Sequence, residues 1–118
     1  MRPQSAKAKG RLLQQKVKAA IIEKFELKSD DVRSTSMGAP GEDIQLSSYA
    51  RLRFPYSVEC KSYARISVYN WYYQALDNAN GHTPLVVMKQ NNSDPLIVMS
   101  WEDFLNLQRQ ATADINRI

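Results

Sequence analysis

The sequence has few of the residues on which several protein classes depend. It contains one cysteine, Cys60, and one histidine, His82, in 118 residues. A lone cysteine excludes an internal disulfide and fits a reducing, cytoplasmic compartment. His82 falls in a predicted turn, so a cysteine nucleophile with a histidine base is disfavoured. No apolar run approaches the roughly 20 residues that cross a bilayer, and no apolar core follows the basic N-terminus. We therefore expect neither a membrane protein nor a secreted one.

Acidic residues are also missing from the start of the chain, where the first is Glu23. Residues 1–18 carry only basic charges, while the whole chain has a formal net charge of +4. The basic residues of this segment are Arg2, Lys7, Lys9, Arg11, Lys16 and Lys18. A basic arm of this kind can neutralise phosphates, although a solvated terminus accounts for the charge equally well. We expect a flexible arm over residues 1–10 and one domain over 11–118.

The rest of the composition, with 43% hydrophobic and 24% charged residues, is typical of a globular domain. Apolar periodicity and turn residues predict an order of helix, two or three strands, helix, strand, strand and helix. Ser100 is expected to cap the last helix. The stretch "YARLRFP" is interpreted as a loop or strand extension. We expect an α/β fold with a single mixed sheet flanked by helices. The helices are predicted over 11–27, 66–79 and 101–110, and the strands over 32–36, 43–48, 56–62, 84–90 and 95–100.

The strand "YSVECKS" carries the most informative polar residues. Side chains alternate along a strand, so Glu59 and Lys61 are expected on one face and Val58 and Cys60 on the other. Cys60 is then a core residue. Glu59 and Lys61 could be a same-face ion pair of little consequence, or part of a site if a second carboxylate lies nearby.

Asp43 is the candidate for that carboxylate. It follows a glycine-rich turn and opens the strand that we expect to lie antiparallel to Glu59. Two carboxylates and the backbone carbonyl of Cys60 would suit Mg²⁺, which prefers oxygen ligands and keeps several waters. A metal-bound water can attack a phosphodiester, and Lys61 could orient it or stabilise developing charge. The alternative is an aspartate that stabilises a turn.

These residues carry a resemblance to a known family. "GED" at 41–43 followed by "ECK" at 59–61 resembles the PD-(D/E)XK nuclease motif, and the element order resembles the αβββαβ core of restriction-endonuclease-like folds. Residues 36–107 look like small phage-type endonucleases related to archaeal-type Holliday-junction resolvases. The chain departs from that pattern where Glu42 stands in place of the proline, and in a longer insert between Asp43 and Glu59.

The resemblance implies a Mg²⁺-dependent DNA endonuclease that accepts Mn²⁺ and needs no organic cofactor. Such an enzyme would work in the cytoplasm, which is that of the host cell if a phage encodes the protein. Asp43 and Glu59 would bind the metal and Lys61 would be the catalytic lysine. Glu23 and Gln74 are further catalytic candidates. Branched DNA is an expected substrate, and two cuts across it would require a homodimer. The expected phosphate contacts are Lys7, Lys9, Arg11, Arg51, Arg53 and Arg65. A non-catalytic nucleic-acid-binding module and an RNA-directed nuclease are the alternatives.

Overall fold

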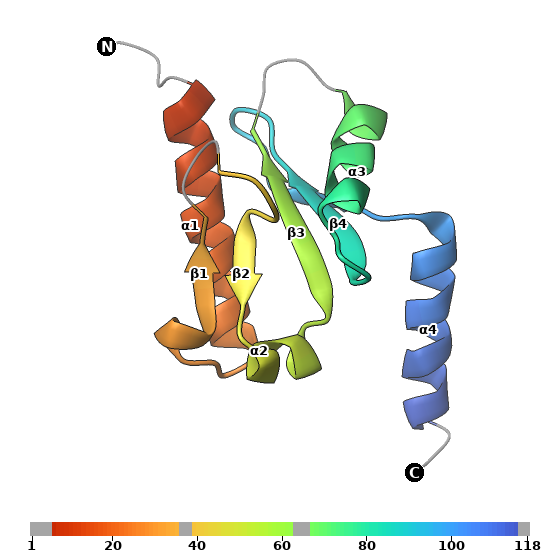
Figure 1. Ribbon diagram of the computed structural model, residues 1–118. Coiled ribbons are helices and arrows are strands. Elements are labelled where there is room, and N and C mark those ends of the chain that lie inside the picture. The colour runs from red at the N-terminus through yellow and green to blue at the C-terminus, as the bar shows by residue number, and fades with distance from the viewer. Residues whose placement is uncertain (1–5, 36–38, 63–66, 116–118) are drawn as a thin grey trace.

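Five strands form one mixed sheet with helices on both of its faces (Figure 1). The computed structural model describes residues 6–35, 39–62 and 67–115. The architecture confirms the predicted fold class. The strands are β1 (Val32–Ser34), β2 (Ile44–Leu46), β3 (Tyr56–Lys61), β4 (Thr83–Met88) and β5 (Leu96–Val98). The helices are α1 (Ala6–Lys24), α2 (Ser48–Arg53), α3 (Val68–Asp77) and α4 (Trp101–Ile115), with a 3₁₀ turn at Ser29–Asp31.

The strands lie in sequence order, β1-β2-β3-β4-β5, and only β3 and β4 pair in parallel. Their long parallel ladder runs from Tyr56 opposite Thr83 to Lys61 opposite Met88. The connection between them carries α3, as a parallel crossover requires. The expected antiparallel approach of β2 to β3 is confirmed, with Ile44 opposite Val58. This pairing brings the strand that follows Asp43 beside the strand that carries Glu59.

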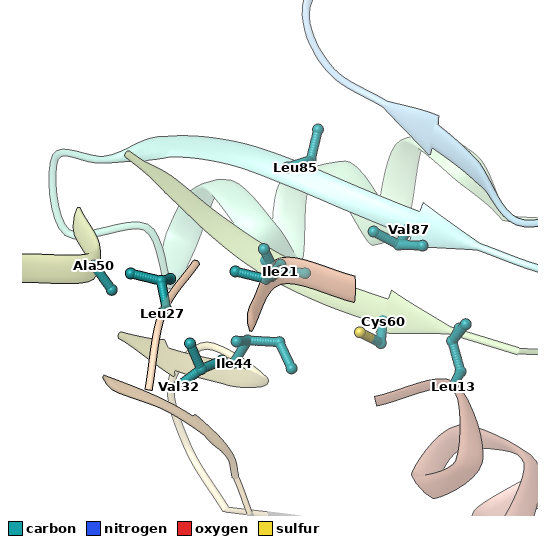
Figure 2. Packing of buried hydrophobic residues seen from close by; sticks show 10 residues of the cluster. Leu13, Ile21, Leu27, Val32, Ile44, Ala50, Cys60, Leu85 and Val87 are labelled. Carbon is teal, nitrogen blue, oxygen red and sulfur yellow. The ribbon is translucent and has the colours of Figure 1, made fainter. Parts of the chain in front are cut away.

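Each face of the sheet packs against its own helix. On the α1 face, Val58 and Cys60 of β3 join Leu85 and Val87 of β4 in a buried cluster (Figure 2). Leu13 of α1 belongs to the same cluster. On the opposite face, Trp71 and Ala75 of α3 pack on Val86. The alternation along β3 therefore separates a core-forming face from the face that carries Glu59 and Lys61.

Helix α1 begins earlier and ends earlier than predicted. Residues 6–10, which we expected in a flexible arm, are helical, because Ala6, Lys7, Ala8 and Lys9 are good helix formers that outweigh the cost of Gly10. The helix stops at Lys24 and not at residue 27, since Glu26 adopts a left-handed conformation with φ of 52°. The basic residues from Lys7 onward consequently project from a helix packed on the sheet.

Helix α2 was not predicted. The hydroxyl of Ser47 accepts a 3.1 Å hydrogen bond from the amide of Ala50, which caps the helix, and Ser47 also donates to Asp31 at 2.7 Å. Ala50 is fully buried. The prediction that 49–55 is a loop or strand extension is wrong because the Ser47 cap and the burial of Ala50 favour a helical turn. Ser100 caps α4 as predicted, accepting from the amide of Asp103 at 3.0 Å.

No helix in the described ranges is both long enough and apolar enough to cross a membrane.

Candidate active site

Asp43 is held by backbone and side-chain hydrogen bonds at the point where β2 and β3 diverge. It follows the turn at Gly41, where φ is 96°. Its amide donates to the carbonyl of Val58 at 3.0 Å, and its carbonyl accepts from the amide of Thr35 at 2.8 Å. Its Oδ2 accepts a 2.8 Å hydrogen bond from the amide of Cys60. The orientation of the carboxylate is therefore fixed by β3 itself.

Glu59 and Lys61 lie together on the α3 side of β3, because they alternate with Val58 and Cys60. Nζ of Lys61 lies 3.1 Å from Oε1 of Glu59, and the two side chains are only 11% and 5% exposed. The ion pair that we considered as an alternative exists, but it is buried. Burying two charges costs free energy that the pairing must offset. A surface ion pair on an ordinary strand does not carry that cost.

The two carboxyl groups are close enough to influence each other electrostatically. Burial raises the pKa of Glu59, and the charge of Asp43 raises it further, whereas Lys61 lowers it. Burial also raises the pKa of Asp43, opposed by the Cys60 amide, the charge of Lys61 and a hydrogen bond from Gln14. Partly desolvated acids that repel each other bind a cation more readily than solvated ones. Such perturbed pairs are typical of functional sites.

Cys60 contributes its backbone to the site and its side chain to the core. Burial raises the pKa of the Cys60 thiol, so the sulfur stays protonated and unreactive. In a strand, the N–H and C=O of one residue point to the same edge. Because the Cys60 amide faces Asp43, its carbonyl oxygen faces the same side. The predicted ligand set of Asp43, Glu59 and the Cys60 carbonyl is therefore compatible with the backbone geometry.

Gln14 is the functional candidate that the sequence analysis missed. It is 5% exposed on α1, and its side chain hydrogen-bonds to the Asp43 carboxylate. At the helical period Gln14 lies on the same side as Val17 and Ile21. The sequence offered one signal for this role: Gln14 is a polar residue on the otherwise apolar face of the first helix. The buried amide of Gln14 is satisfied there by the half-buried carboxylate of Asp43.

Glu23 and Gln74 are not among the groups that shift the pKa of Asp43 or Glu59. Glu23 is exposed, and it lies nine residues after Gln14, which is about 13 Å along the helix axis. Gln74 is exposed on α3, whose buried residues are Trp71 and Ala75. The catalytic roles of Glu23 and Gln74 therefore stay predictions.

The predicted phosphate-binding residues fall into separate regions. Arg51 forms an ion pair with Glu42 and donates to the Tyr56 carbonyl at 2.9 Å, so it fastens the turn before β2 to the start of β3. Arg53 is exposed at that same end, where it contacts Tyr49. The start of β3 is about 16 Å from Lys61, at roughly 3.3 Å per residue. Arg65 lies outside the described residues.

The other predicted phosphate contacts lie on α1. Lys7 and Arg11 are exposed, and Lys9 is half-buried. Gln14, which contacts Asp43, lies on the same helix. Of the predicted phosphate contacts in the described ranges, those on α1 therefore share a helix with Gln14, whereas Arg51 of α2 is occupied by Glu42, the neighbour of Asp43.

The donor set determines which cation the site suits. In the part of the chain that the structure describes, no group of three or more His, Cys, Asp or Glu side chains could hold a metal ion. Two carboxylates and a carbonyl are all oxygen donors. Mg²⁺ takes one or two protein carboxylates and retains waters, so an all-oxygen set of Asp43, Glu59 and the Cys60 carbonyl would suit that ion better than zinc, whose structural sites are built mainly from nitrogen and sulfur.

Comparison with protein-family models, curated proteins and solved structures finds no match for this chain.

Proposed function

We propose that the protein is a Mg²⁺-dependent endonuclease that hydrolyses phosphodiester bonds in DNA. One observation carries the proposal: the Cys60 amide fixes the Asp43 carboxylate beside the buried Glu59–Lys61 pair. Acid, acid and lysine thus converge from β3 and the turn before β2. The resemblance to the PD-(D/E)XK motif, stated on the residues "GED" and "ECK", supports the same assignment.

Asp43, Glu59 and the Cys60 carbonyl would hold Mg²⁺, or Mn²⁺ in its place. The ion would supply a water of lowered pKa and charge for the phosphate oxygens. Lys61 donates a hydrogen bond to the phosphate and offsets the negative charge that builds on it. Glu59, 3.1 Å from Lys61, orients that ammonium group. Gln14 holds Asp43 through its side-chain hydrogen bond.

The substrate and assembly follow from the same resemblance. Branched DNA is the proposed substrate, and paired cuts require a homodimer whose two-fold symmetry presents two sites. The exposed apolar side chains of α4 offer area for a second copy to bury: Trp101, Phe104, Leu105 and Leu107. A lone, buried and protonated Cys60 fits the proposed cytoplasmic location.

The competing proposal is a nucleic-acid-binding module that does not cut. The basic residues of α1 favour it as much as they favour the enzyme. A binding module has no physical need for a buried and a half-buried carboxylate whose pKa values are both raised by desolvation. Those carboxylates would weaken phosphate binding unless a cation lies between them, so they favour the nuclease.

The test is cleavage of supercoiled plasmid, single strands and a four-way junction in Mg²⁺, Mn²⁺ or EDTA. Asp43→Asn, Glu59→Gln and Lys61→Met should each lower the rate by at least about 10²-fold. Asp30→Asn is the matched control, because Asp30 is an exposed aspartate away from the site. Cleavage in EDTA, or variants as active as the control, would refute the metal mechanism. Binding without any cleavage would favour the module, and cleavage of RNA alone would replace DNA as substrate.

A further inference from the structure

A cleft beside the candidate active site collects basic side chains from two distant parts of the chain. Its volume is about 460 Å³, within the roughly 300–1,000 Å³ of small-molecule sites. It lies between α1 and the turn that joins β4 to β5. Its polar lining consists of Lys9, Lys16, Ser62, Lys89, Asn91 and Asn92. Figure 1 shows this turn reaching toward the N-terminal half of α1, at the end of the sheet where β3 finishes.

The charge in this cleft has one sign. Lys9 and Lys16 are seven residues apart on α1, which places them on the same side of the helix two turns apart. Lys89 faces them from the end of β4. No Asp or Glu is among the described residues that line the cleft. Three ammonium groups around one space repel one another, and a bound anion would offset that repulsion.

The turn that closes the cleft has a defined conformation. Asn92 adopts a left-handed conformation with φ of 59°, which asparagine tolerates better than most residues. The Ser93 amide donates to the Gln90 carbonyl at 3.3 Å, and Nζ of Lys89 donates to the same carbonyl at 3.2 Å. Lys89 uses one of its three donors there. Asn91, Asn92 and Ser62 add uncharged donors suited to phosphate oxygens.

The cleft is connected to the candidate active site by the backbone. The Lys89 amide donates to the Lys61 carbonyl at 3.0 Å, and Ser62 follows Lys61 directly. On α1, Leu13 lines the cleft and the next residue, Gln14, hydrogen-bonds to Asp43. The cleft therefore lies at the end of the sheet where β3 finishes, one residue beyond Lys61 and one residue from Gln14, the partner of Asp43 on α1.

We propose that Lys9, Lys16 and Lys89 bind a backbone phosphate of the nucleic-acid substrate that flanks the one being cut. The inference rests on the proposed function for its ligand, and it assigns the substrate's path to the α1 side of the site. Lys16 and Lys89 are added to the predicted phosphate contacts. Arg51, which is paired with Glu42, is removed from them.

The test measures binding without catalysis. Fluorescein-labelled duplex and single-stranded oligonucleotides are titrated in EDTA at about 50 to 200 mM salt, the range over which phosphate contacts dominate the change in affinity. The triple variant Lys9→Gln, Lys16→Gln, Lys89→Gln should weaken binding. The slope of log K against log salt should fall by about 0.9 on duplex and about 0.7 on single strands for the phosphate lost. The matched control is Lys18→Gln, Lys24→Gln, Lys28→Gln, which removes the same charge outside the cleft.

The outcomes separate this inference from the proposed function. If the cleft variant loses affinity and slope and the control does not, the inference holds, even if the wild type cleaves nothing. If the two variants bind alike, the inference is overturned, even if Asp43→Asn abolishes cleavage. Wild type that binds neither oligonucleotide overturns the inference as well. Far-ultraviolet circular dichroism of both variants confirms that each is folded before its binding is compared.

Discussion

The amide of Cys60 donates to Oδ2 of Asp43 across 2.8 Å, and in doing so continues the pairing of β2 with β3 after the backbone ladder has ended. Ile44 opposite Val58 is the paired position between these strands. One residue before Ile44, a carboxylate takes the place that a backbone carbonyl would occupy in a longer strand. The orientation of the Asp43 carboxylate is thereby set by the sheet and not by a flexible loop.

The first prediction concerns the pH dependence of the metal-free protein. A carboxyl whose pKa is raised in the native state keeps its proton to higher pH than it does in the unfolded chain, so stability falls as pH rises above about pH 4. Both Asp43 and Glu59 have raised pKa values. Asp43→Asn removes one acid and its repulsion of Glu59, while the amide oxygen can still accept from Cys60. Thermal melts in EDTA should show a higher melting temperature near neutrality and a flatter decline with pH.

The control for that prediction is Asp30→Asn, which should follow the wild type at every pH. Asp31 is common to all three proteins, and its pKa is shifted in the opposite direction by Ser47. Its contribution therefore cancels in the comparison. Parallel curves for the wild type and Asp43→Asn would show that the site carries no buried charge repulsion.

The second prediction concerns metal binding. Mg²⁺ should stabilise the wild type, because a ligand at about 100 times its Kd adds about 2.7 kcal/mol to the free energy of unfolding. Asp43→Asn and Glu59→Gln should gain little, since each lacks one proposed ligand. Melting temperatures with and without millimolar MgCl₂ measure the effect. An equal rise in all three proteins would place the bound metal elsewhere.

The third prediction distinguishes Gln14 from its neighbour. Gln14→Ala removes the side-chain hydrogen bond to Asp43 and should lower kcat by about 10- to 100-fold, as the loss of an outer partner of a metal ligand does. The apparent affinity for Mg²⁺ should fall with it. Gln15→Ala is the matched control, because Gln15 is exposed and donates instead to Ser34 at 2.9 Å. Glu23→Ala should behave like the control. Equal losses in the Gln14 and Gln15 variants would indicate a general effect on α1.

The fourth prediction concerns the ion pair of Glu59 and Lys61. Removing one partner of a buried pair leaves an uncompensated charge and costs about 3–5 kcal/mol. Lys61→Met should therefore lower the free energy of unfolding by roughly that amount. The double variant Glu59→Gln, Lys61→Met should recover most of the loss while remaining inactive. Urea denaturation of the single and double variants measures the coupling. Strictly additive losses would mean that the pair behaves as a solvated one.

The fifth prediction concerns the core beneath the site. Ile44 is fully buried next to Asp43, so Ile44→Ala should cost about 2–5 kcal/mol. Ile97→Ala is the matched control, because Ile97 is 61% exposed and its loss should stay within about 0.5 kcal/mol. The urea midpoints of both variants provide the comparison. Similar losses in the free energy of unfolding would indicate that a partner covers Ile97 in solution.

Local periodicity was enough to predict most of this fold. The alternation of "VECK" separated Glu59 and Lys61 from Val58 and Cys60, and the apolar run at residues 84–90 identified β4. Both follow from the period of a strand. Helix α2 was missed because six residues carry too little periodicity, and its formation depends on the Ser47 cap and on the burial of Ala50. Such tertiary effects cannot be read from the local pattern.

The candidate site was predicted in part for the same reason. Asp43, Glu59 and Lys61 share two neighbouring strands, so strand geometry alone brought them close. Glu23 was the catalytic candidate on the first helix, yet the position along α1 that reaches Asp43 is set by how the helix crosses the sheet. Gln14 occupies that position. Arg51 was expected to contact phosphate, but it pairs with Glu42, and that pairing depends on α2.

The two faces of β3 can therefore be altered independently. The side chains of Val58 and Cys60 are constrained by the volume available against α1, whereas those of Glu59 and Lys61 are constrained by their charges. Replacing the charged pair by neutral side chains of similar shape would leave every core contact of the strand in place. A cutting protein on this scaffold and a protein that only holds nucleic acid are then separated by very few substitutions, all on one side of a single strand.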